Sequence, residues 1–442
     1  MRHSDTQMPW TKQGGRTVKE IKTILVANRG EIAIRIFRAC KELGIRSVAI
    51  YSEEDKNSLY RTMADESYRV GKGKTPVDAY LDISGIITLA KSKGVDAIHP
   101  GYGFLSENAD FAKACEEAGI EFIGPDHNML NALGDKIQSK KVAIEVGVPT
   151  IPGVERAALN VEEAKEFAKV CGYPVIIKAS AGGGGRGMRI VRAEEDMEAE
   201  YNSATSEAKK AFGIADVFVE KYIENPKHIE VQILGDKYGN IVHLFERDCS
   251  IQRRHQKVIE FAPSLILNDA QREAICEDAI KIAQHVNYRS AGTVEFLVDK
   301  NGNHYFIEMN PRIQVEHCVT EQITDIDLVQ AQIRVAQGYK LDSPEINIPS
   351  QDAITYHGYA IQCRVTTEDP ANNFAPDTGT IDVYRSSSGK GIRLDSGNAY
   401  AGAKISPFYD SLLVKIIAYN RTFEGTINSA LRCLNETKIK GV

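Results

Sequence analysis

The sequence has little or nothing of the features that mark several large classes of protein. Its 442 residues contain 1 Trp and 15 Pro, and no apolar run approaches the roughly 20 residues of a membrane span. Neither sign of charge dominates, because 54 Lys and Arg stand against 60 Asp and Glu for a net charge of −6. This balance gives no basic footprint for nucleic acid, and a hydrophobic share of 43% excludes a disordered chain. We therefore expect neither a nucleic-acid partner nor a membrane partner.

The sequence also has no pair of cysteines spaced as CxxC. Its 8 cysteines are scattered along the chain. They are Cys40, Cys115, Cys171, Cys249, Cys276, Cys318, Cys363 and Cys433. This scatter argues against a structural zinc site or a disulfide framework and favours reduced, mostly buried thiols. We expect a cytoplasmic protein, or one of the mitochondrial matrix if the source is eukaryotic.

The length predicts two or three domains, because 442 residues exceed what one hydrophobic core holds. Residues 1–17 are polar, lack the apolar stretch of a signal peptide, and read as a tag or disordered extension. We expect domains at 18–134, 135–350 and 351–442, with a mobile lid subdomain at 149–222. Pro149, Pro152 and Gly153 mark the start of that lid.

The first domain alternates short apolar runs with helical spacing. Ile24–Ala27 reads as a strand buried on both faces, and a helix follows the turn Asn28–Glu31 until Gly44. Further strand and helix patterns continue to Gly124, whereas Asn57–Lys74 reads as a loop. Strands separated by helices predict an open parallel sheet with right-handed crossovers, which is a Rossmann-like α/β fold.

The lid segment contains five glycines in six residues between two predicted strands. They follow Ala181 and are Gly182, Gly183, Gly184, Gly185 and Gly187. A dinucleotide fingerprint needs a helix after the loop, yet Met188–Arg192 reads as a strand, and no Lys follows as in a Walker A loop. The loop is therefore interpreted as a flap whose backbone N–H groups approach phosphate oxygens, near Lys178. The alternative is a mobile hairpin without a ligand.

Two carboxylates are expected to meet across a hairpin. Strand-like segments flank Asn301–Gly302, a strong turn signal. A two-residue turn there makes Glu295 and Glu308 direct cross-strand partners, and Asn310 lies two residues further on the same face. Opposed carboxylates repel unless a cation lies between them, so this set predicts a Mg²⁺ or Mn²⁺ site. A solvent-facing acidic pair that splays apart remains the alternative, and a longer loop would change the register.

Polar residues alternate after this hairpin. Arg312, Gln314 and Glu316 have period two, which suggests an oxyanion clamp and a general base beside the metal. A structural salt bridge is the alternative. The run Cys249–Lys257 is cationic and is either a solvated face or a wall of an anion site.

Several motifs together resemble the ATP-grasp fold and, more closely, biotin carboxylase. The resemblance rests on blocks in order along the chain from about residue 20 to the end. These blocks are Val26–Ala33, His99–Asn108, the glycine loop, Glu220–Ile223, Glu246–Lys257 and Arg312–His317. Blocks at 366–370, 372–374, 376–379 and 405–410 are similar to pyruvate carboxylase and less to the acetyl-CoA carboxylase subunit. The resemblance implies a C-terminal domain with a mixed or antiparallel sheet.

The resemblance implies a reaction in which MgATP activates bicarbonate to carboxyphosphate, which then carboxylates biotin. It implies catalytic roles for Glu316 as general base, Arg364 toward the biotin enolate, Lys257 toward the transferred phosphoryl group and Arg312 toward bicarbonate. It also implies metal binding by Glu295, Glu308 and Asn310. Nucleotide or bicarbonate contacts are implied for Lys136, Lys178, Gly182, Gly183, Gly184, Gly185, Gly187, Glu220, Lys221, Tyr222, Ile223, His228, Gln252, His255, Gln314 and Val315.

The implied cofactors are ATP, Mg²⁺ or Mn²⁺, and biotin carried on another domain or subunit. No Met-Lys biotin acceptor occurs in the sequence, so the carrier and carboxyltransferase domains are expected elsewhere. Arg35 and Asp410 lie in segments that resemble the family's dimer contact, and we expect a homodimer. The alternatives are a biotin carboxylase subunit of another acyl-CoA carboxylase, another ATP-grasp carboxylate–amine ligase, and a non-catalytic nucleotide-binding module.

Overall fold

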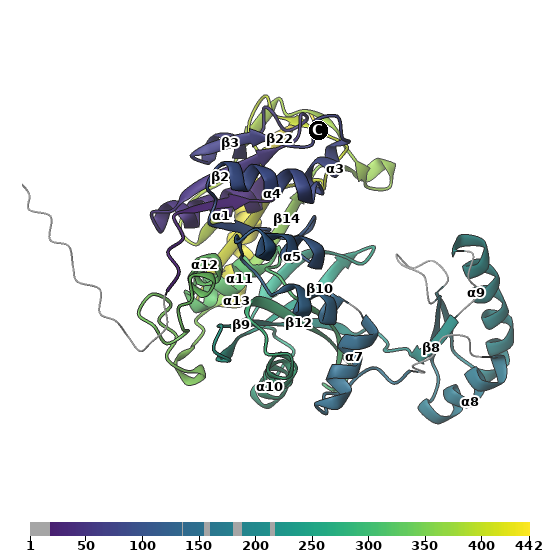
Figure 1. Cartoon of the computed structure of the whole chain (residues 1–442). Helices are drawn as coiled ribbons and strands as arrows, with labels where there is room; N and C mark the ends of the chain where they lie inside the picture. The colour runs from purple at the N-terminus through teal and green to yellow at the C-terminus, as the bar shows by residue number, and fades with distance from the viewer. Residues whose placement is uncertain (1–17, 135, 154–159, 180–187, 213–216) are drawn as a thin grey trace, which may run out of the picture.

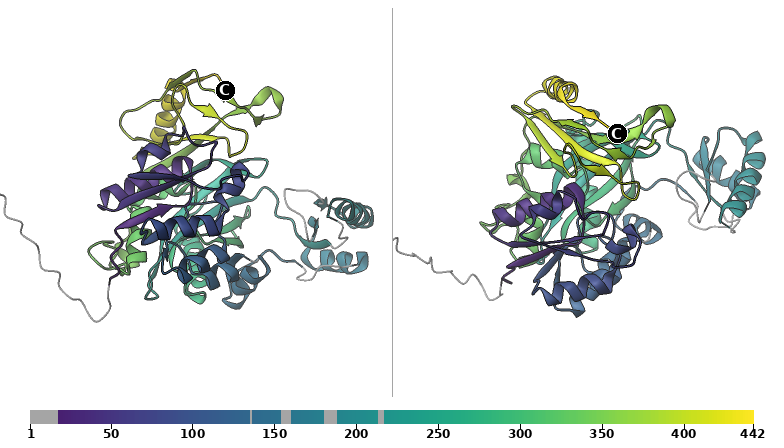
Figure 2. Two further views of the ribbon diagram at one scale, coloured as in Figure 1. Left: turned by 45° about the horizontal axis from the view of Figure 1, so that its top comes forward. Right: turned by 90° about the horizontal axis from the view of Figure 1, so that it is seen from above.

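The protein has a large body and a smaller unit that projects from it (Figure 1). The computed structural model describes residues 18–134, 136–153, 160–179, 188–212 and 217–442. The two views of Figure 2 show the same separation, with the smaller unit beside the body in both. The fold is mixed α/β, as predicted.

The N-terminal part of the body is a five-stranded parallel sheet in the order β3-β2-β1-β4-β5. Its strands are β1 (Thr23–Val26), β2 (Arg46–Tyr51), β3 (Glu66–Arg69), β4 (Ala97–His99) and β5 (Glu121–Phe122). Its helices are α1 (Gly30–Glu42), α2 (Tyr60–Met63), α3 (Pro76–Tyr80), α4 (Ile83–Ser92), α5 (Ala109–Glu117) and α6 (His127–Gly134). This confirms the predicted Rossmann-like arrangement.

One prediction in this sheet was wrong. Asn57–Lys74, expected as a loop, contains α2 and the edge strand β3. β3 reads Glu-Ser-Tyr-Arg and is only partly buried, so it has no apolar run that would distinguish it from a loop. By contrast β1, buried along its whole length, was recognised from its apolar run.

The projecting unit is a small antiparallel sheet with two α-helices and one short 3-10 helix among its described residues. Its sheet has the order β7-β6-β8, with β6 (Val175–Ala179), β7 (Arg189–Val191) and β8 (Val217–Lys221). Its helices are η1 (Glu194–Asp196), α8 (Val161–Cys171) and α9 (Met197–Phe212). The strands and α9 match the predicted pattern. α8 had not been predicted, although Asn160 and Glu163 form a capping box at its start, a signal readable in the sequence.

An eight-stranded sheet forms the centre of the body. Its order is β13-β12-β9-β10-β11-β14-β21-β19, and its neighbouring strands are antiparallel. The strands are β9 (Lys227–Gly235), β10 (Ile241–Arg253), β11 (Gln256–Ala262), β12 (Ser290–Val298), β13 (His304–Asn310), β14 (Tyr359–Thr366), β19 (Ile392–Ser396) and β21 (Leu412–Asn420). Because β11 pairs with β14, one sheet continues across the domain boundary predicted at residue 350.

Helices and short strands complete the body. The remaining helices are α7 (Lys136–Glu145), α10 (Asp269–His285), α11 (His317–Thr324), α12 (Leu328–Gln337), α13 (Phe423–Glu436), η2 (Gln351–Ala353) and η3 (Pro370–Asn372). The short strands are β15 (Glu368–Asp369), β16 (Ala375–Pro376), β17 (Gly379–Thr380), β18 (Val383–Arg385), β20 (Lys404–Ile405) and β22 (Lys438–Lys440). Among the described residues, no helix is both long and apolar enough to cross a bilayer.

The thiols behave as predicted. All 8 cysteines are free, and seven of them are buried while Cys171 is half-buried. Burial raises the pKa of buried thiols such as Cys40 and Cys115, each to about 12, so they remain protonated near neutral pH. They pack as small apolar side chains.

The hairpin of β12 and β13 brings Glu295 opposite Glu308, as predicted, but by a different route. The turn is not the expected two-residue loop, because Asp299 N–H donates to Asn303 O and Gly302 N–H to Asp299 O. Gly302 has φ +84°, which fits the left-handed residue that closes a three-residue loop. This longer loop shifts the register by one residue, and a bulge between Glu295 and Phe296 shifts it back.

Candidate active site

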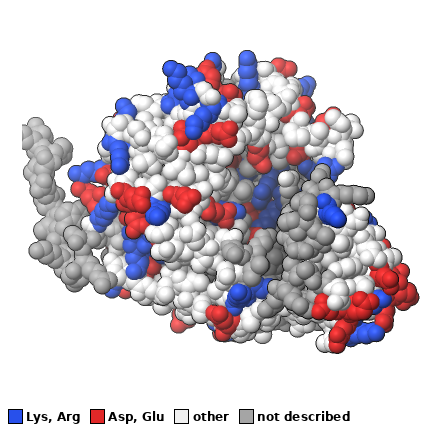
Figure 3. Space-filling model, turned by 45° about the vertical axis from the view of Figure 1, so that its right-hand side comes forward, with Lys and Arg blue, Asp and Glu red and all other residues white. Residues whose placement is uncertain are grey.

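A cleft of about 1010 Å³ opens over one face of the large sheet. Its lining includes the turn Asn28–Ile32 and residues 102–104 of the N-terminal part, residues of strands β9 to β14 and of the loop 312–316, and residues 408–412, which lead into β21. Figure 3 shows Lys and Arg side chains gathered inside a recess near the middle of one face of the molecule. The cleft contains most of the residues that the sequence singled out.

A row of charged residues crosses four adjacent strands of the large sheet, and two of its members, Glu295 and Glu308, line the cleft. Arg247 on β10 pairs with Glu230 on β9, Glu230 pairs with Glu295 on β12, and Glu295 pairs with Glu308 on β13. Residues paired in this way have side chains on the same face of a sheet. The sheet therefore places three carboxylates side by side, with a guanidinium at one end.

Lys257 on β11 binds two carboxylates of this row and a third carboxylate, that of Glu316. Its ammonium lies 2.5 Å from Glu230, 2.9 Å from Glu295 and 2.8 Å from Glu316. Burial alone would lower the pKa of Lys257, but the charges of Glu230 and Glu316 outweigh burial and raise the pKa well above its ordinary value. Lys257 is therefore a fixed positive charge at the centre of the cleft.

Arg364 on β14 also binds Glu316, through the carboxylate oxygen that Lys257 does not contact. Its Nη2 lies 3.0 Å from Glu316 Oε2, and its Nε lies 2.5 Å from Glu260 Oε1. Burial would raise the pKa of Glu316, yet Lys257 and Arg364 hold it below its ordinary value. Glu316 is thus a buried but ionised carboxylate between two cations. Burial raises the pKa of Glu260 above its ordinary value even though Arg364 opposes the shift.

The predicted metal ligands have suitable chemistry but are bonded to protein groups here. Glu295 Oε1 accepts hydrogen bonds from Asn310 Nδ2 at 2.9 Å and Gln314 Nε2 at 3.0 Å, and its Oε2 lies 2.7 Å from His228 Nε2. Asn310 directs its Oδ1 to Arg312 at 3.1 Å. Two carboxylates and an amide are the hard oxygen donors that Mg²⁺ prefers, so the donor set fits this ion. Asn310 would have to rotate its amide to present the oxygen.

The loop after β13 presents Arg312, Gln314 and Val315 to the cleft. Arg312 Nε lies 2.8 Å from Glu107, which belongs to the predicted block His99–Asn108. Arg312 also donates to the Ile313 carbonyl oxygen and to Asn310 Oδ1, and since a guanidinium has five N–H donors, two remain for an anion. The structure therefore brings together Arg312, Glu316, Lys257 and Arg364, the four predicted catalytic residues.

The other predicted cleft residues lie at its edge. His228 bonds Glu295, and although burial would lower its pKa, that bond raises the pKa above its ordinary value. Gln252 lies opposite Lys257 across the β10–β11 hairpin. His255 is exposed at the tip of this hairpin, with φ +63°. All three line the cleft.

The predicted nucleotide residues of the projecting unit lie on its sheet. Lys178 Nζ lies 2.6 Å from Glu220 on the neighbouring strand β8. Of the Lys221–Ile223 segment, the Lys221 N–H donates to Pro152 O and the Tyr222 N–H to Pro174 O. Lys136 begins α7, but its side chain is not among the described groups. Gly182, Gly183, Gly184, Gly185 and Gly187 lie outside the described residues.

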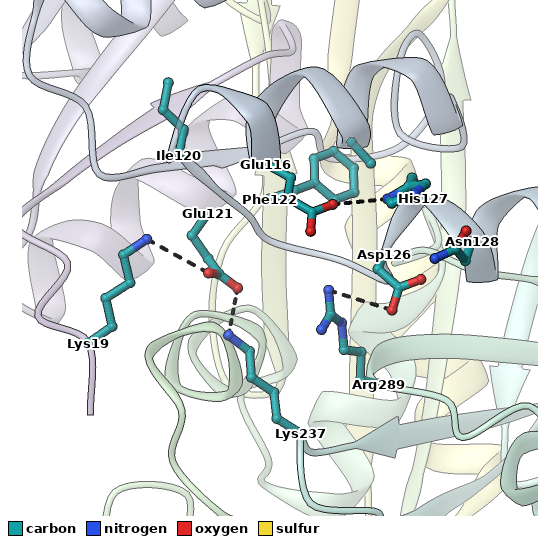
Figure 4. Close-up of a pocket in the computed structure, with 12 residues that line it drawn as sticks. Lys19, Glu116, Ile120, Glu121, Phe122, Asp126, His127, Asn128, Lys237 and Arg289 are labelled. Atoms are coloured by element: carbon teal, nitrogen blue, oxygen red, sulfur yellow. Dashed lines mark hydrogen bonds and ion pairs between the residues drawn. The ribbon is translucent and has the colours of Figure 1, made fainter. Parts of the chain in front are cut away.

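A second hollow, of about 370 Å³, lies between the region of α5, β5 and α6 and the side chains of Lys237 and Arg289 (Figure 4). Its cations and carboxylates pair with each other. The pairs are Lys237 with Glu121 at 2.6 Å, Lys19 with Glu121 at 3.8 Å, Arg289 with Asp126 at 3.9 Å and His127 with Glu116 at 3.0 Å. The larger cleft, and not this hollow, is lined by the predicted catalytic and metal-binding residues, so it is the candidate active site.

Sequence reasoning missed Glu230, Glu260 and Arg247. All three are fully buried, and Arg247 donates to Glu230, Gln232, Thr293 and Thr320. A signal for Glu230 existed, because His228, Glu230 and Gln232 alternate with apolar residues along β9. Period-two polar residues on a strand this apolar mark a face that serves a site rather than solvent.

Family models match almost the whole described chain in three parts. "Biotin carboxylase, N-terminal domain" matches residues 20–130, "Carbamoyl-phosphate synthase L chain, ATP binding domain" matches 135–344, and "Biotin carboxylase C-terminal domain" matches 362–442. A solved structure of the biotin carboxylase domain of thermophilic 2-oxoglutarate carboxylase, bound to bicarbonate, is 51% identical with a TM-score of 0.90. The match covers 96% of this chain and 91% of that one. The chain belongs to the biotin carboxylase family.

Other biotin carboxylase relatives are parts of longer proteins. The chain is 60% identical to pyruvate carboxylase of Bacillus subtilis and 57% identical to mitochondrial pyruvate carboxylase of Homo sapiens. Each match covers 96% of this chain, which spans 37% and 36% of the length of these relatives. The biotin carboxylase domain dimer from Hydrogenobacter thermophilus, in complex with MgADP and bicarbonate, is 52% identical with a TM-score of 0.86, over 96% of this chain and 91% of that one.

Proposed function

We propose that this chain catalyses the ATP- and Mg²⁺-dependent carboxylation of biotin by bicarbonate through carboxyphosphate. The observation that carries the proposal is the position of Glu316, a buried ionised carboxylate between Lys257 and Arg364. A base, a phosphate-binding cation and a second cation for an anionic intermediate therefore converge at one point. Family membership supports this use of the cluster.

In the proposed first half-reaction, Arg312 and the Gln314–Val315 backbone bind bicarbonate beside Glu316. Glu316 accepts the bicarbonate proton while a bicarbonate oxygen attacks the γ-phosphorus of ATP, and ADP leaves. Lys257 turns from the carboxylates to the transferred phosphoryl oxygens. This movement removes one of the two positive charges that hold the pKa of Glu316 low, so Glu316 becomes more basic when the proton must move.

Mg²⁺, held by Glu295 and Glu308 with Asn310, would supply charge neutralisation to the ATP phosphates. The chain's own contribution there is to keep these oxygens on adjacent strands, where the cross-strand pairing fixes their spacing. Lys178 and Lys136 are proposed to hold the phosphates under the glycine loop. We propose that Glu220 and the backbone of Lys221–Ile223 read the adenine. Since the Lys221 and Tyr222 N–H groups donate within the chain, the other backbone groups of this segment would make the contacts. His228, Gln252 and His255 complete the nucleotide side.

In the proposed second half-reaction, carboxyphosphate breaks down to CO₂ and phosphate, the released phosphate accepts the N1′ proton of biotin, and N1′ then attacks the CO₂. Negative charge develops on the ureido oxygen during the loss of this proton, and the Arg364 guanidinium stabilises it. Carboxyphosphate would be lost to water in an open site, so the cleft must exclude water while the reaction proceeds.

We further propose that the parent protein is a pyruvate carboxylase, which passes carboxybiotin to pyruvate on a carboxyltransferase domain. High identity to the bacterial and human enzymes supports this parent. Biotin would arrive on a separate carrier domain, and a homodimer is proposed from the dimeric relative. We place the protein in the cytoplasm of a bacterium, or in the mitochondrial matrix of a eukaryote, since relatives from Mus musculus and Homo sapiens are named mitochondrial.

The proposed domains are those expected from the sequence, 18–134, 135–350 with its lid at 149–222, and 351–442.

The deciding experiment measures ADP release from MgATP with and without bicarbonate and free biotin. We expect release that needs both additions. MgATP binding without any stimulated release would contradict the proposed catalysis and favour a non-catalytic nucleotide-binding module.

A further inference from the structure

Two cations occupy neighbouring positions beside the loop 311–316 between β13 and α11, called the catalytic loop below. Lys415 on β21 is the direct cross-strand partner of Arg364 on β14, and Asp395 on β19 is its partner on the other side. Partners of this kind extend from the same face of the sheet. Arg364 holds the Glu316 side chain, as described above, whereas Lys415 has no part in the proposed chemistry.

Lys415 is fully buried and contacts the residue before Glu316. Its Nζ donates to the Val315 carbonyl oxygen at 3.0 Å. It also lies 3.1 Å from Glu31 Oε2 and 3.7 Å from Asp395 Oδ2. A buried lysine is costly unless its charge is compensated, and here two carboxylates compensate it.

Glu31 brings the N-terminal sheet into this contact. It lies in the first turn of α1, within the block Val26–Ala33 that the sequence singled out, and it lines the cleft. The two parts approach so closely that a Cβ at Gly397 would lie 3.1 Å from the Glu31 backbone nitrogen. The Glu31–Lys415 pair therefore joins the N-terminal sheet, the large sheet and the catalytic loop at one point.

Two successive carbonyls of the loop are held by buried side chains. The His317 ring lies 2.7 Å from Gln314 O through Nδ1, and Lys415 holds Val315 O. A peptide unit is planar, so fixing the Val315 carbonyl also fixes the orientation of the following Glu316 N–H and the start of the Glu316 side chain. With both carbonyls turned toward the protein interior, the loop keeps one orientation toward the cleft.

We propose that Lys415 is a positioning residue for bicarbonate, which acts by fixing the Val315–Glu316 peptide while Glu31 keeps its charge compensated. This inference rests on the proposed function, because it assigns the bicarbonate site to this loop. Lys415 itself touches no reactant. Its contribution is the orientation of the groups that do.

The test is the affinity of the MgADP-bound chain for bicarbonate, measured by titration calorimetry without turnover. Lys415→Met keeps the length of the side chain and removes the donor, and we expect bicarbonate to bind about tenfold more weakly or worse. The affinity for MgADP should change by less than about twofold, a readout of the intact fold. Lys237→Met is the matched control, since Lys237 also holds a carboxylate (Glu121) and a backbone carbonyl (Ala336), but away from the cleft.

A second variant separates positioning from charge balance. Lys415→Met leaves Glu31 uncompensated, so it can fail to fold for that reason alone. Glu31→Gln combined with Lys415→Met removes the uncompensated carboxylate, and we expect a folded chain whose bicarbonate affinity remains low. Wild-type affinity in this double variant would overturn the inference, because it would show that Lys415 only balances charge.

The outcomes distinguish the two proposals. If the wild-type chain binds bicarbonate but shows no biotin-dependent ADP release, the proposed catalysis is contradicted. The bicarbonate affinities of the variants then still decide whether Lys415 has a positioning role. A wild-type chain that binds MgADP but no bicarbonate overturns the positioning inference itself.

Discussion

Glu230 and Glu295 face each other across β9 and β12, and both carboxylates bind the ammonium of Lys257. Two like charges at directly opposed positions would repel each other without that ammonium. Lys257 belongs to the β10–β11 hairpin, whereas Glu230 and Glu295 belong to β9 and β12. The three side chains meet because β9 lies between β12 and β10 in the sheet. The predictions below follow from this cluster and its neighbours.

Lys257→Gln is expected to lower bicarbonate-dependent ADP release by about 100-fold or more, because it removes the cation aimed at the transferred phosphoryl group. The loss also leaves Glu230, Glu295 and Glu316 without their shared partner, so thermal stability should fall. Steady-state kinetics and a melting curve measure the two effects. Near-normal turnover in a folded variant would remove Lys257 from the mechanism.

Glu316→Gln is expected to abolish bicarbonate-dependent ADP release and to leave MgADP binding within about twofold, because an amide cannot accept the bicarbonate proton. The matched control is Glu345→Gln, a change at an exposed glutamate. Single-turnover measurements would show whether the phosphoryl transfer step itself is lost. Retained turnover would mean that another group acts as the base.

Glu295→Gln and Glu308→Gln are each expected to raise the Mg²⁺ concentration needed for half-maximal activity by about tenfold or more, since each removes one anionic ligand. Titration of activity with Mg²⁺ at saturating ATP provides the measurement. Glu277→Gln, on the exposed side of α10, serves as the control. An unchanged Mg²⁺ requirement in both variants would place the metal elsewhere.

Lys178→Ala is expected to weaken ATP binding several-fold, because it removes a cation placed for the phosphates. In this structure Lys178 is bound to Glu220, so nucleotide must compete with an internal partner. Fluorescence titration with a labelled nucleotide would measure the affinity. An affinity equal to that of the unmodified chain would refute this assignment.

Two buried histidines predict loss of stability in mild acid. Burial lowers the pKa of His99 and of His317 to about 3, from an ordinary value of 6.5. Both are therefore neutral in the folded chain, and their stabilising effect is complete above pH 6.5 and is lost as the pH falls from 6.5 toward 3. At pH 5, each histidine lowers the free energy of unfolding by about 2 kcal/mol relative to its value above pH 6.5.

The measurement is the melting temperature of the body between pH 7.5 and 5. His99→Gln should flatten the decline, because one fewer buried group resists protonation. His357→Gln, a change at an exposed histidine, should keep the full decline. Equal slopes in His99→Gln and the unmodified chain would contradict the assignment.

Hydrophobic runs and spacing in the sequence predicted individual strands and helices. The apolar run of β1, the glycine-flanked strands β6 and β7, and the helix Asp269–His285 were all readable, because burial and helical spacing act over a few residues. The pairing of Glu295 with Glu308 was also correct, although two errors compensated each other. The loop was one residue longer than predicted, and a bulge that no sequence signal announced restored the register.

The centre of the site could not be derived from spacing in the same way. Glu316 meets Arg364 at a separation of 48 residues and Lys257 at a separation of 59. Those contacts depend on the order of strands in the sheet, which hydrophobic periodicity does not specify. The roles of Lys257 and Arg364 came from family resemblance. Arg247 lay in a block that carried the resemblance but received no role, and Glu260 was not singled out.

The continuous eight-stranded sheet has a consequence for how the chain unfolds and how it can be divided. Since β11 and β14 are hydrogen-bonded neighbours, a cut at residue 350 would expose an unpaired strand edge on each fragment, and such edges aggregate. The strands before and after that point should exchange their amide hydrogens in one cooperative event. The projecting unit has its own sheet and its own buried cluster, so it should open and exchange independently, at lower free energy. Hydrogen exchange would then divide this chain into parts different from those suggested by its family models.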